Sequence, residues 1–333
     1  MMTDSITDIS GIKVGHASDL EGVTGCTVIL CEKGATPGVD QRGGGPGTRE
    51  FALLNPVNHV DQVHAIVLAG GSAFGLDAAS GVMQYLEENG IGYETRIARI
   101  PIVPAAILFD LNIGDPKIRP TPEMGYLACV NATKNKPEQG SIGAGTGATV
   151  GKVLGMDRAT KSGIGTASVE IGNGVYVGAI VAVNAIGDVI NPDNGKIIAG
   201  LRSEKMPDRE EKTAVEFSDT LKFLRSEAGR SLFSMAERSN TVIGVVATNA
   251  KFDKAYCTKM AQMAQNGLVR TIRPATTMHD GDTIFALSTG TQKANINIVG
   301  AFAAQAVQKA VLNAVLHATS LGGVPAVSDF FVS

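Results

Sequence analysis

"AERSNTVIGVVATNA", residues 236–250, places three polar residues directly before an apolar run that is typical of a buried β-strand. Those residues are Ser239, Asn240 and Thr241, although glycine or proline turns a chain more readily at such a point. Before them lies the segment 201–240, which is crowded with charges of both signs. The feature to explain is a threonine at the first position of a strand, behind an asparagine and a long charged segment.

Beyond this segment the sequence again shows the hydrophobic patterns of strands and helices. Apolar runs and helical periodicity predict alternating strands and helices at 241–248, 253–268, 282–289 and 296–319. Two strands and two helices are too few to bury a core alone. We therefore expect a single domain, residues 1–333, with 201–240 as a charged excursion on its surface.

The part of the chain before the excursion also mixes strands and helices. Strands are predicted at "GIKVGH", "GCTVILCE" and "VHAIVLAGG", and a helix at "GLDAASGVMQYLEENG". Residues 167–200 read as hairpins, because Asn173-Gly174 and Asn194-Gly195 are strong two-residue turn signals. The expected fold class is therefore α/β in the broad sense, with α+β character.

Composition narrows the class of partner. The 333 residues are 44% hydrophobic and 18% charged, and the net charge of −3 favours neither nucleic acid nor an anionic membrane. Aromatic residues make up 5%, with no tryptophan, so stacking platforms for single strands are not expected. We expect a small-molecule or peptide substrate.

The four cysteines contain no C-x-x-C pair, and such a scatter in a long chain does not indicate a disulfide framework. The first residues show no basic region followed by an apolar one, and no continuous apolar run reaches the roughly 18 residues of a membrane helix. A cytoplasmic protein is expected.

Two familiar sequence motifs are matched only in part. "GAGTGA", residues 143–148, has the glycine spacing of a dinucleotide loop without the flanking strand and helix. "GGSAF" around Ser72 lacks the closing glycine of a nucleophile elbow, so Ser72 is either a nucleophile or part of a tight strand-to-helix turn. The five histidines show no ligand spacing, so no metal or other cofactor is expected.

An enzyme without histidine or metal can still activate a threonine. A threonine at a chain N-terminus can use its own α-amine as a base, because that amine titrates near about 7.7–8.0. Cutting the chain before Thr241 would create such a residue and mount it on a rigid strand. The plain alternative is that Thr241 is simply a β-branched residue at the start of a strand, behind a turn asparagine.

Several blocks taken together decide between these readings. They are "DISGIKVGH", "QRGGGPGTRE", "VLAGGSAFGLDAASGV", "VPAAILFDL", "GSIGAGTGATVGK" and "NTVIGVVATNA". In content and order they resemble the L-aminopeptidase/D-esterase (DmpA-like) family, which includes β-aminopeptidases and nylon-oligomer hydrolases. The resemblance spans nearly the whole chain.

This resemblance implies a fold and a processing step. The family fold is a four-layer α-β-β-α sandwich, similar in layers to N-terminal-nucleophile hydrolases and shared with ornithine acetyltransferases. Members cut themselves before a serine or threonine. Here the cut would fall between Asn240 and Thr241, giving an α chain of 1–240 and a β chain of 241–333. A homotetramer of αβ units is expected.

The resemblance also assigns site residues. Thr241 matches the nucleophile, Lys152 a lysine beside it, and Asn184 the asparagine that binds the oxyanion, while Asp280 and Asp282 match the acids of the nylon-oligomer hydrolases. Plainer alternatives exist for the last four: a solvated turn lysine for Lys152, a hairpin asparagine for Asn184, and an Asp-Gly turn for Asp280 and Asp282.

One block departs from the pattern. Phe109 stands where some relatives carry a tyrosine that helps to bind the oxyanion, so Asn184 and a backbone N–H would carry more of that role. We expect Phe109, with Gly71 and Ser72, to contribute to the substrate pocket.

The function expected is that of a self-processing hydrolase that releases N-terminal residues from small peptides, amides or esters, with ω-amino-acid oligomers as further substrates. Two other functions stay open. One is an acyltransferase of the ornithine acetyltransferase type, and the other is an uncleaved binding protein on the same fold.

Overall fold

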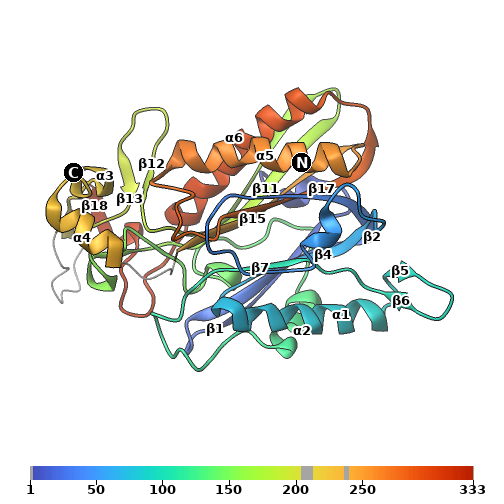
Figure 1. Ribbon diagram of the computed structural model, residues 1–333, viewed down its shortest axis with the longest axis horizontal. Coiled ribbons are helices and arrows are strands. Elements are labelled where there is room, and N and C mark those ends of the chain that lie inside the picture. The colour runs from blue at the N-terminus through green and yellow to red at the C-terminus, as the bar shows by residue number, and fades with distance from the viewer. Residues whose placement is uncertain (1–2, 204–212, 236–239, 333) are drawn as a thin grey trace.

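Nine strands, hydrogen-bonded in one continuous order that a long shared strand divides into two sheets, form the centre of the molecule (Figure 1). The computed structural model describes residues 3–203, 213–235 and 240–332. The first sheet contains β1 (Lys13–Asp19), β2 (Thr24–Gln41), β3 (Thr48–Arg49), β4 (Val63–Ala69) and β7 (Ala105–Ile107). The second contains β10 (Ile164–Gly172), β11 (Val175–Asn184), β15 (Thr241–Ala250) and β17 (Thr283–Gln292), and it is completed by the far end of β2.

Six α-helices and several short elements complete the described chain. The helices are α1 (Ala78–Glu88), α2 (Pro122–Val130), α3 (Thr220–Phe223), α4 (Glu227–Met235), α5 (Lys254–Thr271) and α6 (Ile296–Leu316). The small strand pairings are β5 (Tyr93–Glu94) with β6 (Arg99–Ile100), β8 (Thr149–Val150) with β9 (Thr160–Lys161), β12 (Asp188–Ile190) with β13 (Ile197–Ala199) and β16 (Ile272–Arg273), and β14 (Thr213–Val215) with β18 (Phe330–Val332). The 3₁₀ turns are η1 (Ile6–Asp8), η2 (Ala52–Leu54), η3 (Ser72–Asp77), η4 (Gly143–Gly145), η5 (Met156–Arg158) and η6 (Val327–Asp329).

The two sheets pack face to face and each carries helices on its outer face. Figure 1 shows α1 and α2 on one side and α5 and α6 on the other. Between the sheets, Ile66 and Leu68 of β4 share an apolar core with Phe285 of β17. These layers are the four-layer α-β-β-α sandwich that the family resemblance predicts.

β15 is apolar from Val242 to Ala247 because both of its faces are buried there. Val242 and Val246 pack in the core beneath α5 and α6, whereas Ile243 and Val245 pack between the sheets. Alternate side chains of a strand point to opposite faces, so a strand with core on both sides needs a continuous apolar run. This explains the continuous apolar run "VIGVVA", residues 242–247, that follows Thr241.

β2 is longer than the sequence predicts. The strand expected over "GCTVILCE" continues through Gly34 and Pro37 to Gln41, because it pairs with β4 in its first half and with β17 in its second. It therefore belongs to both sheets. The hairpin turn predicted at Asn173-Gly174 is confirmed, because both residues lie between β10 and β11 and have positive φ, as a type I′ turn requires. The two-residue turn predicted at Asn194-Gly195 is wrong: these residues lie in the longer loop 191–196 between β12 and β13, and only Gly195 has positive φ.

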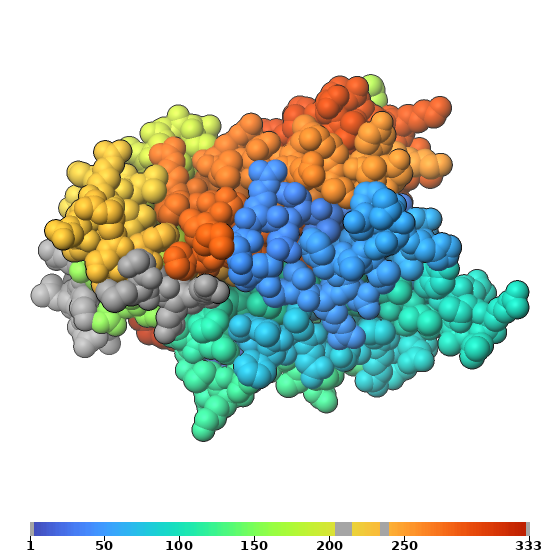
Figure 2. Space-filling view, viewed as in Figure 1, coloured from blue at the N-terminus to red at the C-terminus, as the bar shows by residue number. Residues whose placement is uncertain are grey.

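The charged segment 201–240 is less exposed than predicted. Its described residues form β14, α3 and α4, and Figure 2 shows these helices in yellow at one end of the molecule. Phe223, Leu224 and Phe233 pack against the buried Val153 and Leu201. Apolar residues spaced among the charges thus attach the segment to the body of the protein.

α6 resembles a membrane helix in length and hydropathy, although no membrane helix is predicted from the sequence. Among the described residues it is long and apolar enough, by length and mean hydropathy, to cross a membrane. However, 56% of its most apolar window is buried inside the molecule. Its apolar side chains, such as Val307 and Val311, pack in the core with α5.

Candidate active site

Strand register brings the predicted site residues together around Thr241. Asn184 is the last residue of β11 and lies directly opposite Thr241 in the antiparallel pair. On the other side of β15, Asn240 forms a bridge with Asp280, just before β17. The asparagine and the Asp-Gly-Asp turn therefore flank Thr241 from its two neighbouring strands.

The Asn240–Thr241 peptide is buried and polarised. The carbonyl oxygen of Asn240 accepts a hydrogen bond from the N–H of Gly281 at 3.1 Å and another from the hydroxyl of Thr241. Thr241 is 4% exposed and Asn240 2%. The hydroxyl of Thr241 is thus held against the carbonyl of the peptide group that precedes it.

The two aspartates hold the backbone around Thr241. Asp282 accepts the N–H of Val242 at 2.7 Å and the N–H of Thr276 at 2.9 Å. Asp280 accepts the N–H of Thr277 at 2.6 Å. Burial raises the pKa of both carboxyls, and the neighbouring charge of Asp280 helps to raise the pKa of Asp282 to about 7.

Lys152 lies buried beside Asn184, so it is not a solvated turn lysine. Its Nζ donates to the side-chain oxygen of Asn184 at 2.8 Å and to the Asn184 carbonyl at 3.2 Å. Burial lowers the pKa of Lys152 to about 7, although the charges of Asp280 and Asp110 oppose this shift. Its protonation can therefore change near neutral pH.

The amide of Asn184 has a defined orientation. Its oxygen accepts from Lys152 and from the N–H of Thr149 at 3.1 Å, while its nitrogen donates to the carbonyl of Phe109 at 2.8 Å. Donors on one side and an acceptor on the other distinguish the oxygen from the nitrogen. The side chain of Asn184 is therefore fixed by contacts with two chain segments, unlike that of a hairpin asparagine at the surface.

Phe109, Gly71 and Ser72 lie at the edge of this cluster. Phe109 contributes its backbone carbonyl, through the contact with Asn184. Gly71 and Ser72 form a strand-to-helix turn in which both have positive φ, and the N–H of Ser72 donates to the carbonyl of Leu108 at 3.0 Å. Ser72 is thus part of a tight turn next to the segment that holds Phe109.

The glycine-rich loop 42–47, to which no sequence motif gives a role, borders the site. The N–H of Gly45 donates to the carbonyl of Asp280 at 2.8 Å, and that of Arg42 to the carbonyl of Asp282 at 2.9 Å. A Cβ at Gly281 would lie 2.9 Å from the Thr241 hydroxyl oxygen and 3.0 Å from the Gly45 carbonyl. The cluster "RGGGPG" was the available signal, because such clusters mark close backbone approach.

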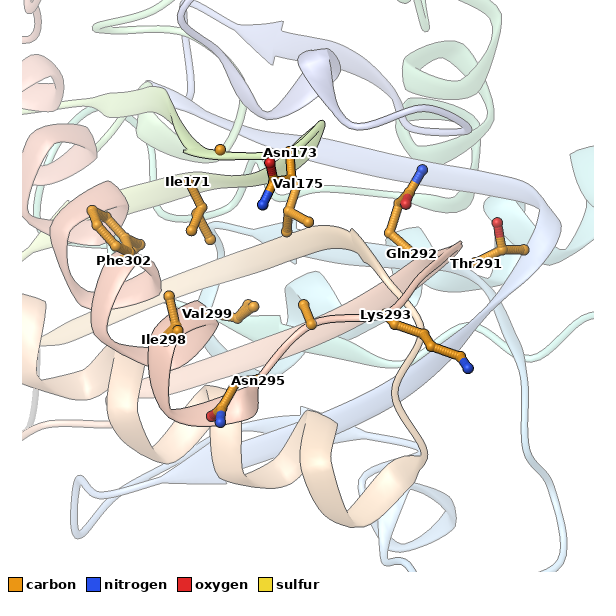
Figure 3. Close-up of a pocket in the computed structure, with 12 residues that line it drawn as sticks. Ile171, Asn173, Val175, Thr291, Gln292, Lys293, Asn295, Ile298, Val299 and Phe302 are labelled. Carbon is orange, nitrogen blue, oxygen red and sulfur yellow. The ribbon is translucent and has the colours of Figure 1, made fainter.

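A separate groove of about 580 Å³ lies at the other end of the second sheet (Figure 3). Its walls include Ile171 and Val175 of the β10–β11 hairpin and Ile298 and Phe302 of α6. Val175 begins β11, whereas Asn184 ends it, so nearly the full strand separates this groove from Thr241. In the described part of the chain, no group of three or more His, Cys, Asp or Glu side chains is arranged to hold a metal.

Comparison with known proteins identifies the class. The fold is similar to that of the L-aminopeptidase D-Ala-esterase/amidase from Ochrobactrum anthropi, described as a variant of the Ntn hydrolase fold. The TM-score is 0.71 at 19% identity, and 97% of this chain and 88% of that one are covered. The chain therefore has the DmpA-like variant of the N-terminal-nucleophile hydrolase fold.

Comparison of the amino-acid sequence with known families and proteins shows the family of this chain. The model of peptidase family S58 matches residues 4–327, and the chain belongs to this family. It is 42% identical over 364 residues to an uncharacterised aminopeptidase of Mycobacterium leprae, covering 98% of this chain and 94% of the relative. It is 31% identical over 320 residues to a 6-aminohexanoate-oligomer endohydrolase of Kocuria sp., covering 92% and 84%. The protein is a hydrolase of peptide or amide bonds, of the aminopeptidase or amidase type.

Proposed function

We propose that this protein is a self-processing hydrolase whose catalytic residue is Thr241, set free as a new N-terminus by cleavage after Asn240. The observation that carries the proposal is the position of the Thr241 hydroxyl. It contacts the Asn240 carbonyl between Asn184 on one neighbouring strand and the Asp280–Asp282 turn on the other. A threonine that served only as a strand residue would need none of these partners.

In the cleavage step, the Thr241 oxygen attacks the carbonyl carbon of Asn240. The bond from that carbon to the Thr241 nitrogen then breaks, which leaves an ester and a free α-amine. Water hydrolyses the ester and gives Asn240 a carboxyl end. The N–H of Gly281 already donates to the oxygen on which negative charge develops, as an oxyanion donor must.

In turnover, the free α-amine of Thr241 takes the proton from its own hydroxyl, which attacks an amide or ester carbonyl. The amide of Asn184 stabilises the resulting oxyanion, and the nearby Lys152 polarises that amide through its oxygen. Proton transfer to the leaving amine completes acylation. Water then releases the acyl group.

We expect the purified protein to release the N-terminal residue from amino-acid amides and dipeptides, and we would test linear 6-aminohexanoate oligomers in parallel. Products are identified by mass spectrometry, with and without an added amine acceptor. Free acyl product in both conditions supports a hydrolase. Transfer of most of the acyl group to the acceptor would support an acyltransferase instead, and absence of turnover with every substrate would contradict both.

The pH dependence of kcat/KM provides a second test. The rate should rise with pH as the α-amine loses its proton, and fall as Lys152 loses its own above about pH 7. A cation near the amine lowers the pKa of that amine. In Lys152→Met the rising limb should therefore move to higher pH and the falling limb should disappear. Lys196→Met, in the exposed β12–β13 turn, is the control. Superimposable profiles for the wild type and Lys152→Met would contradict this role.

A further inference from the structure

Asp110 is a buried carboxylate that the steps above do not use. It is 1% exposed and lies just beyond β7, next to Phe109. One carboxylate oxygen accepts the N–H of Gly71 at 2.6 Å, and the other accepts the hydroxyl of Thr24 at 2.8 Å. It thus ties its own segment to the start of β2 and to the turn after β4.

Glycines of two chain segments make room for this carboxylate. A Cβ at Gly70 would overlap the Asp110 carboxylate, and one at Gly147 would lie 2.7 Å from its Oδ2. Both glycines have ordinary negative or extended φ, so space rather than backbone conformation requires them. Part of the glycine enrichment in "LAGGSAFG" and "GAGTGA" therefore serves to enclose Asp110.

The surroundings of Asp110 contain a compensating cation. Lys161 is fully buried, and its Nζ donates to the carbonyls of Gly145, Ala148 and Ser162 at 2.7–3.2 Å. Its charge, together with the two hydrogen bonds, opposes the effect of burial, which still raises the pKa of Asp110 to about 6. Burial also lowers the pKa of Lys161 to about 7, so both groups titrate near neutral pH, and the position of Asp110 rests on its two hydrogen bonds.

The link to the site runs through one peptide group. Asp110 fixes the backbone immediately after Phe109, and the Phe109 carbonyl accepts the amide nitrogen of Asn184 at 2.8 Å. That contact sets the plane of the amide and hence the direction of its second N–H. A shift of the Phe109 carbonyl would rotate the group that faces the oxyanion.

We propose that Asp110 is a positioning residue that holds the Phe109 carbonyl, and through it the Asn184 amide, in the orientation needed for the oxyanion. This rests on the proposed function, in which Asn184 binds the oxyanion. Lys152 and Thr149 also hold the amide, so the effect of losing Asp110 should be smaller than that of losing Asn184.

The test is Asp110→Asn, alone and combined with Asn184→Ala, with rates expressed per N-terminal threonine. Asparagine keeps the shape but has one acceptor oxygen and no negative charge. It either turns its NH2 group toward the Gly71 N–H or reverses the hydrogen bond with the Thr24 hydroxyl, and each change weakens the hold on the segment. We expect kcat to fall about tenfold, with KM unchanged, as for other groups that orient a catalytic partner. In the Asn184→Ala background the same change should alter kcat less than twofold, because the amide it orients is gone.

Asp188→Asn is the matched control. Asp188 is also buried and accepts two backbone N–H groups and a hydroxyl, from Leu201 and Thr220. The Asp188→Asn substitution should lower the free energy of unfolding without changing kcat per active site. If Asp110→Asn does not fold, Thr24→Val removes one of the two hydrogen bonds at similar volume and should lower kcat two- to threefold.

The outcomes separate the two proposals. If Asn184→Ala is slow but Asp110→Asn and Thr24→Val keep the wild-type kcat, the positioning role is wrong and the proposed function stands. A tenfold effect of Asp110→Asn that persists without the Asn184 amide also overturns the positioning role. If Asn184→Ala itself keeps the wild-type kcat, the oxyanion role in the proposed function is wrong.

Discussion

Thr241→Ala should remain a single chain of 34.5 kDa without hydrolase activity. The wild type should instead give two chains of about 25 and about 10 kDa, by division of the mass in proportion to length. Alanine keeps the strand but removes the hydroxyl that contacts the Asn240 carbonyl, so neither the cleavage nor the acylation has a nucleophile. Intact-mass spectrometry of both proteins, together with N-terminal sequencing of the smaller chain, checks the result.

Thr241→Ser is the matched control for this experiment. Serine retains the hydroxyl and the α-amine but lacks the methyl group, so it should still cleave and should retain measurable turnover. Two outcomes would contradict the proposed function: a wild-type protein that stays whole and inactive, or an alanine variant that is cut at the same bond. The first would favour the uncleaved binding protein.

Asn184→Ala should lower kcat by about 10²–10³-fold while KM changes little. An oxyanion exists only in the transition state and the tetrahedral intermediate, so its donor contributes to kcat rather than to substrate binding. The variant also leaves the buried Lys152 without the amide oxygen it contacts at 2.8 Å. Steady-state kinetics per N-terminal threonine measure the effect.

Two comparisons make the result interpretable. Asn184→Asp keeps the shape but places a negative charge where the oxyanion forms, so it should be at least as slow as the alanine variant. Asn194→Ala, in the exposed β12–β13 turn, should behave as the wild type. A loss that appears only as a raised KM would mean that Asn184 binds substrate and not the oxyanion.

The layers of the fold and the position of Thr241 were predictable from the sequence because they depend on long patterns. Continuous apolar runs and helical periodicity located β15, α5, β17 and α6, and a set of blocks in family order supplied the four-layer arrangement. What the sequence could not provide is the register. That Asn184 lies opposite Thr241 follows from pairing between residues 57 positions apart in the chain, for which no local pattern exists.

Elements whose structure depends on distant partners were missed. Gly34 and Pro37 are typical turn residues, so the end of β2 was expected near Glu32, but pairing with β17 extends the strand. Asp110 and Gly281 were overlooked for a related reason. Their importance comes from hydrogen bonds to segments tens of residues away, which composition and spacing do not reveal.

The strand order has a lasting consequence for an enzyme cut at Thr241. β15 and β17 both come from the part after the cut, and they sit side by side between β11 and β2, which come from the part before it. After the proposed cleavage, the smaller chain would therefore lie between strands of the larger one and be hydrogen-bonded to it along both edges. Removing it would mean opening two hydrogen-bonded ladders and the cores on both faces at once. Each enzyme molecule would keep for its lifetime the two halves that were synthesised as one chain, without exchanging them with other molecules.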